Sequence, residues 1–100
     1  MKALMITPEN KTIVSIEISG LDDIVKLIGF DSIISDAIDN NGDHLYFDED
    51  CFLRGSEGRF QIDTLVPVSG IGIIVGVSDD ATLRDVTVDI DDISGRIKYL

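Results

Sequence analysis

The spacing of apolar residues changes abruptly at Ser19, and this change constrains the fold more than any other feature of the sequence. Before it, Val14, Ile16 and Ile18 alternate with polar residues, which is the pattern of a strand with one buried face. After it, apolar residues recur at helical spacing over Leu21–Ile28. A half-buried strand followed directly by an amphipathic helix predicts an α+β fold.

Signals at both ends of this helix support it. Ser19 is the expected N-cap, with Asp22 three residues later as its capping-box partner. Gly29 is expected to end the helix in the left-handed conformation.

Two antiparallel hairpins are predicted in the first half of the chain. Lys2–Thr7 and Thr12–Ile18 are joined by a short polar turn. Ser32–Ile38 and His44–Phe47 flank the pair Asn41-Gly42, whose residues tolerate positive φ in a tight turn.

The second half of the chain predicts one central strand and little regular structure before it. Ile71–Val77 is β-branched and too apolar for an edge, and its glycines indicate a bulge or a close backbone approach. Short apolar pieces at 51–53 and 60–62 surround Arg54–Arg59, which is expected to be irregular. Val86 and Val88 are expected to form a short final strand.

A terminal helix is predicted to close the domain. Asp89 is its expected N-cap, and Ile90, Ile93 and Ile97 repeat at helical spacing. Because 100 residues are too few for two separate cores, we expect a single α+β domain over residues 1–100. It should be a mainly antiparallel sheet with one packed helix and a C-terminal helix.

The charge of the chain is strongly acidic and limits its partners. Eight Lys and Arg residues oppose 19 Asp and Glu residues, a formal net charge of −11. This charge repels phosphates and disfavours direct binding to nucleic acid or to an anionic membrane. It suits basic partners, although solubility alone also explains it. No apolar stretch is long enough for a signal peptide or a membrane span, so a cytoplasmic location is expected.

No catalytic, cofactor-binding or metal-ligating residues are predicted. His44 has no G-x-S-x-G nucleophile to serve and is expected to be exposed beside its turn. Cys51 is expected to be a small packing residue. One cysteine and one histidine cannot build a zinc site within a single chain.

Two further patterns fail the spacing of the sites they suggest. If Asp39 is position one of an EF-hand, the required glycine and the final glutamate are both missing from their positions. The glycines at 70–76 lie within a strand pattern, whereas a phosphate-binding loop opens a helix. We therefore expect neither a metal nor a cofactor.

Several segments share their layout with a known family. They are Lys2-Ala3-Leu4-Met5-Ile6-x-Pro8, Ile16-Glu17-Ile18, Gly20-Leu21-Asp22-Asp23-Ile24 leading to Ile28-Gly29, and Asp48-Glu49-Asp50-x-x-Leu53-x-Gly55. With the glycine-bearing strand and the terminal helix that follow, the chain resembles a family of small, uncharacterised proteins of phages, plasmids and gut-type bacteria. The resemblance implies a mobile-element context and brings no catalytic residues with it.

The function expected from these observations is that of a non-enzymatic accessory or protein-interaction protein of mobile-element type. The alternative is an acidic inhibitor that mimics DNA and occupies a host nuclease or restriction protein. A small enzyme without a recognisable motif is a third hypothesis. Exposed apolar surface is expected around Phe52, Phe60 and Leu65–Val68. A symmetric homodimer is the simplest assembly that would bury it.

Overall fold

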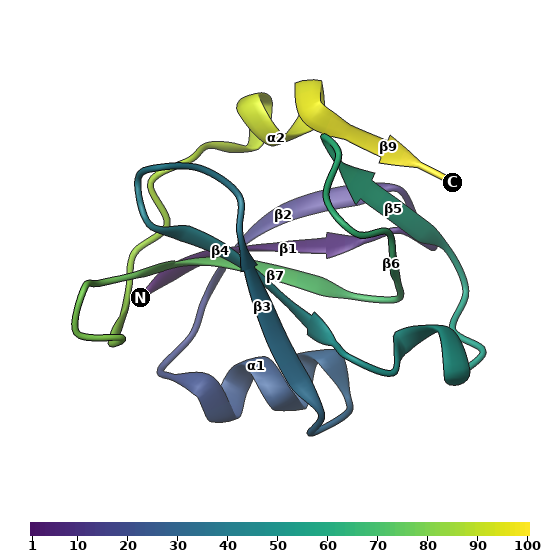
Figure 1. The fold of residues 1–100 in the computed structure, drawn as a ribbon, viewed down its shortest axis with the longest axis horizontal. Helices are drawn as coiled ribbons and strands as arrows, with labels where there is room; N and C mark the ends of the chain where they lie inside the picture. Colours follow the sequence, from purple (N-terminus) through teal and green to yellow (C-terminus); the bar gives the residue numbers. More distant parts are fainter.

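A six-stranded antiparallel sheet forms the middle layer of the computed structural model, which describes residues 1–100 (Figure 1). Its strands are β1 (Lys2–Thr7), β2 (Thr12–Glu17), β3 (Ile33–Ala37), β4 (Asp43–Asp48), β7 (Gly72–Val77) and β8 (Leu83–Arg84). They run in the order β2-β1-β7-β4-β3, with β8 also paired to β7. Both predicted hairpins are therefore confirmed.

The central position predicted for Ile71–Val77 is also confirmed, because β7 lies between β1 and β4. Ile73, Ile74 and Val75 have no exposed surface. Successive side chains point to opposite faces, so Ile74 belongs to one core cluster while its two neighbours belong to the other. The sheet is thus covered on both faces.

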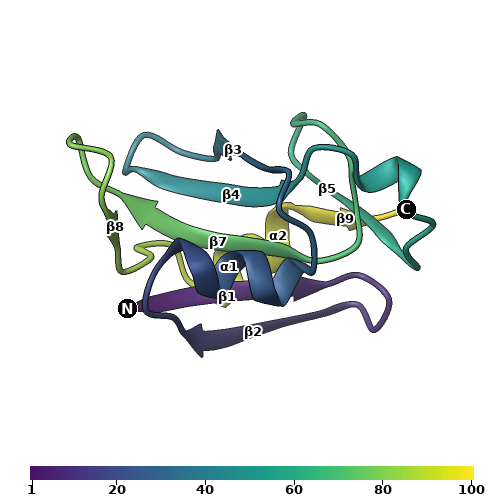
Figure 2. The same ribbon diagram turned by 90° about the horizontal axis from the view of Figure 1, so that it is seen from below.

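Helix α1 (Leu21–Ile28) covers one face of the sheet (Figure 2). Ile24 and Ile28 are buried there in one cluster with Ala3 and Val75. The apolar stripe that predicts the helix is therefore also the surface that packs it.

The two ends of α1 differ in how well the sequence predicts them. Gly29 ends the helix in the left-handed conformation, with φ 90°, as expected. Ser19 is not the N-cap: Gly20 holds that position, and no side chain caps the helix. The Ser19 N–H instead donates to the carboxylate of Asp23 at 2.6 Å, so Asp22 is not the partner residue.

The opposite face is covered by a second, three-stranded sheet and by helix α2, which lie across the large sheet from α1 (Figure 1). These elements are β5 (Arg59–Ile62), β6 (Val68–Ser69), β9 (Ile97–Tyr99), α2 (Ile90–Arg96) and, nearby, the 3-10 helix η1 (Cys51–Leu53). Their order in the small sheet is β6-β5-β9. The α+β fold, its mainly antiparallel sheet and its C-terminal helix are as predicted, whereas the small sheet is not predicted by the sequence.

The terminal helix is predicted correctly at its start and wrongly at its end. Asp89 caps it by accepting the Asp92 N–H at 2.8 Å, and Ile93 is completely buried. Ile97, however, lies outside the helix and pairs with Ile62 in β9. The spacing of Ile97 from Ile93 is helical, but pairing with β5 takes precedence.

Val86 and Val88 do not form the predicted final strand, because β8 lies earlier, at Leu83–Arg84. The Val86 N–H donates to the Lys2 carbonyl at 2.9 Å. The Val88 N–H donates to the carboxylate of Asp43 at 3.1 Å. Single hydrogen bonds, rather than a ladder, hold this segment against the large sheet.

Candidate functional site

Asp43 is the one charged side chain with no exposed surface. Its carboxylate accepts hydrogen bonds from the Thr87 N–H at 2.8 Å, the Thr87 hydroxyl at 2.5 Å and the Val88 N–H at 3.1 Å. Burial alone would raise the pKa of Asp43, but these hydrogen bonds together outweigh burial and lower it. The ionised carboxylate therefore joins β4 to the segment that leads into α2.

Asp39 organises the turn beside this buried carboxylate. Its side chain accepts the N–H groups of Asn41 and Asp43 at 2.8 and 3.2 Å. Burial and the neighbouring carboxyl group of Asp43 raise the pKa of Asp39, and the two N–H groups offset only part of this rise. Arg84 adds a hydrogen bond to the Asn41 carbonyl. No group of three or more His, Cys, Asp or Glu side chains in the chain is arranged to hold a metal ion.

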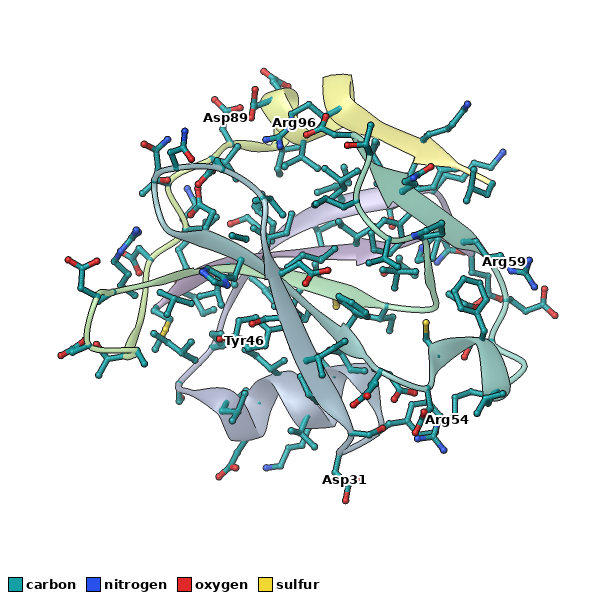
Figure 3. The ribbon with its side chains drawn as sticks, in the orientation of Figure 1. Asp31, Tyr46, Arg54, Arg59, Asp89 and Arg96 are labelled. Atoms are coloured by element: carbon teal, nitrogen blue, oxygen red, sulfur yellow. The ribbon has the colours of Figure 1, made fainter.

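Arg54 forms a second set of polar contacts between chain segments, near the C-terminal end of α1 (Figure 3). Its guanidinium donates to Asp48 at 2.8 Å and to the Ser32 hydroxyl at 3.0 Å. It also lies over the Phe30 ring, 4.2 Å from the centroid. Burial opposes ionisation of Asp48, but the hydrogen bonds from Arg54 and Ser32 lower its pKa overall. These contacts hold the segment after η1 against the start of β3.

Arg96 forms a third set of polar contacts, at the end of α2 (Figure 3). It donates to Asp63 at 2.5 Å, to the Ile38 carbonyl at 2.6 Å and to Asp92 at 3.3 Å. Two of these partners lie 33 and 58 residues away in sequence. No local pattern in the sequence marks such long-range contacts.

His44 does not lie where the sequence predicts. It is half-buried within β4 rather than exposed beside the turn, because the strand begins at Asp43. Its Nδ1 atom is buried without a hydrogen-bond partner. Adjacent residues of a strand point to opposite faces, so Asp43 is not oriented toward this ring.

Cys51 and the strand glycines have structural roles. Cys51 is 3% exposed in the core, where its Sγ accepts the Ser69 N–H at 3.4 Å. A Cβ atom on Gly72 would lie 2.7 Å from the Phe60 ring, and one on Gly76 would lie 2.5 Å from a backbone oxygen. The expected close backbone approach is confirmed.

A hollow with exposed apolar side chains lies on the outer side of the small sheet. Its volume is about 530 Å³, and its lining includes Phe52, Glu57, Arg59, Pro67 and Leu100. Ser56 and Gly58 complete the lining, in which Phe52 and Leu100 are the hydrophobic residues; we call this site the apolar hollow after these two side chains. Phe52 and Leu100 are 50% and 58% exposed.

Residues between 52 and 67, together with Leu100, assemble this hollow. Phe60 and Ile62 in β5 face the core. Arg59 lies on the other face of the strand and therefore points toward solvent (Figure 3). Leu100 follows β9 and donates its N–H to the Arg59 carbonyl at 2.9 Å. The Arg59 guanidinium lies 5.2 Å from the centroid of the Phe52 ring, which η1 carries.

The apolar surface predicted in this region is partly correct. Phe52 is exposed, and so is Val66, at 57%. Phe60 and Val68 are completely buried, because they face the large sheet, and the expectation that they are exposed is wrong. Leu65 is half-buried and packs against the same core.

Acidic turns lie at the other end of the longest axis of the molecule. The β3–β4 turn and the β7–β8 loop are on the left in both views, whereas β5 and β9 are on the right (Figures 1 and 2). The left-hand loops carry Asp39, Asp79 and Asp80. We call these three residues the acidic end.

No family model, curated protein or solved structure matches the chain. The resemblance to small phage and plasmid proteins therefore remains a prediction. None of the helices is both long and apolar enough to cross a membrane.

Proposed function

We propose that this chain is a non-enzymatic accessory protein of a mobile genetic element, which acts in the cytoplasm by binding another protein through the apolar hollow. The observation that carries the proposal is the convergence of exposed Phe52 and Leu100 in one concave patch. Exposed apolar side chains that converge within a polar rim often mark protein interaction sites. A second copy of the chain, in a homodimer, is the simplest such partner.

The buried charged groups support a binding role over a catalytic one. A catalytic group needs a tuned pKa and access to a substrate. The buried carboxylates are instead bound to other parts of the chain, Asp43 to Thr87 and Asp48 to Arg54. Their lowered pKa values follow from these structural hydrogen bonds.

DNA mimicry would use a different surface, the acidic end. There Asp39 accepts hydrogen bonds within its own turn, and Asp80 accepts the Thr82 hydroxyl at 2.7 Å. Turn chemistry explains both residues without a partner. The two hypotheses therefore predict different sensitive surfaces.

The two hypotheses can be distinguished by capturing binding partners from a bacterial lysate on the immobilised protein. We compare the wild type with Phe52→Asp in the hollow and with a combined Asp79→Asn, Asp80→Asn variant at the acidic end. Leu21→Asp is the matched control, because Leu21 lies on α1 and is 52% exposed, close to the 50% of Phe52.

The proposal expects a protein that Phe52→Asp no longer retains, while the other two variants retain it. A nuclease or restriction protein lost only by the acidic-end variant would replace the proposal with DNA mimicry. Retention by all three variants would exclude both surfaces.

A further inference from the structure

We infer that the apolar hollow is the interface of a symmetric homodimer, so that its occupant is a second copy of this chain. The inference rests on the proposed function, because it names the partner of the same surface. Two properties of the hollow support a second copy: its local charge and the opposite signs of two of its residues.

The local charge at the hollow differs from the charge of the whole chain. The molecule carries −11, and two copies repel each other wherever carboxylates predominate. At the hollow, Arg59 accompanies Glu57, and Lys98 is exposed on the neighbouring strand, at the position paired with Gln61. Cations thus at least balance the carboxylate on this surface.

The acidic end is far from this surface. The molecule extends 33 Å along its longest axis, and the acidic turns and the small sheet lie toward opposite ends of it (Figure 2). In physiological salt, charge interactions are screened over about 8 Å. Two copies joined at their hollows therefore keep their acidic ends beyond strong repulsion, whereas a basic partner would be attracted to those ends instead.

Opposite charges in the hollow also suit a two-fold axis. In an interface of this symmetry, residue i of one copy contacts residue j of the other, and j contacts i. Arg59 and Glu57 lie two residues apart and both line the hollow. A two-fold arrangement can therefore pair Arg59 of each copy with Glu57 of the other, around a centre made by Phe52, Pro67 and Leu100.

The size of the surface predicts a weak dimer. A stable interface buries roughly 800 Å² on each partner. That area would be about one seventh of the 5506 Å² that the whole chain exposes, more than a hollow lined by 7 residues covers. We therefore expect a dimer that dissociates on dilution rather than a permanent one.

Sedimentation equilibrium of the purified chain tests the inference over roughly 5–500 μM protein. The wild type should pass from monomer to dimer over this range in about 0.15 M salt. Phe52→Asp and Leu100→Asp should remain monomeric. Leu21→Asp introduces the same charge at an equally exposed position outside the hollow and should dimerise like the wild type.

Charge exchange tests the two-fold pairing directly. Arg59→Glu and Glu57→Arg should each weaken the dimer, although Glu57→Arg makes the chain less acidic. The double variant, in which the charges are exchanged, should restore association. Singles that both weaken the dimer without recovery in the double variant would overturn the pairing.

A wild type that is monomeric at the highest protein concentration would overturn the inference. A dimer that persists in both Phe52→Asp and Leu100→Asp would also overturn it, because the interface would lie elsewhere. A monomeric wild type that still captures another protein through Phe52 would leave the proposed function intact while this inference fails.

Discussion

The buried carboxylate of Asp43 accepts two hydrogen bonds from Thr87, which lies 44 residues later in the chain. The contact joins the first residue of β4 to the segment that leads into α2. One side chain therefore connects the large sheet to the layer that covers it, and this connection can be tested.

Replacing Asp43 with Asn should destabilise the fold by about 2–4 kcal/mol. The amide is nearly isosteric, but its NH₂ group must face either the Thr87 N–H or the Val88 N–H, so one buried donor loses its acceptor. Urea unfolding measures the loss. Asp79→Asn, at an exposed loop position, should change the free energy of unfolding by less than about 0.5 kcal/mol. Equal effects of the two variants would contradict a structural role for Asp43.

The contribution of Asp48 to stability should depend on pH. Its pKa is lowered in the folded state, because the hydrogen bonds from Arg54 and Ser32 outweigh burial, whereas an unfolded aspartate titrates near 3.9. A lowered folded-state pKa stabilises the fold above the unfolded value and loses this effect as the pH falls through the folded value. The stability difference between the wild type and Asp48→Asn should therefore be constant from pH 7 to about pH 5 and shrink below about pH 4. Urea titrations at several pH values measure it, and a pH-independent difference would refute the assignment.

Two glycine substitutions should change the free energy of unfolding in opposite directions. Gly72→Ala places a methyl group 2.7 Å from the Phe60 ring and 2.9 Å from Leu45, so it should cost about 1–3 kcal/mol through overpacking. Gly95→Ala, inside α2, meets no atom within 4 Å and should stabilise the protein by about 0.5–1 kcal/mol. Thermal unfolding of the two variants checks both signs, and a stabilising Gly72→Ala would show that β7 can move away from β5.

Helix α2 should be required for the core. Ile93 is completely buried in the cluster that joins α2 to both sheets, so Ile93→Ala should cost about 2–4 kcal/mol by leaving a cavity. Ser94→Ala is the control, because the neighbouring Ser94 is exposed. Denaturant unfolding distinguishes them. If Ile93→Ala unfolded at the same denaturant concentration as Ser94→Ala, the helix would not be part of the cooperative unit.

The elements that the sequence predicts well are those specified by residues close together in the chain. Alternating apolar residues identify the first hairpin, and helical spacing identifies α1. Gly29 and Asp89 act on backbone groups within a few residues, so their capping roles are also visible locally. The continuous apolar run at 71–77 requires burial on both faces and thereby predicts the central position of β7.

The small sheet and the apolar hollow follow only from the tertiary structure. Ile97 continues the helical spacing of α2, yet it pairs with Ile62, because β5 would otherwise leave unpaired backbone groups against the core. Phe52 and Phe60 are equally apolar in sequence, but one faces solvent and the other faces the large sheet. Local patterns thus determined which segments become strands and helices early in the chain, whereas long-range pairing determined which apolar side chains are buried and which remain exposed.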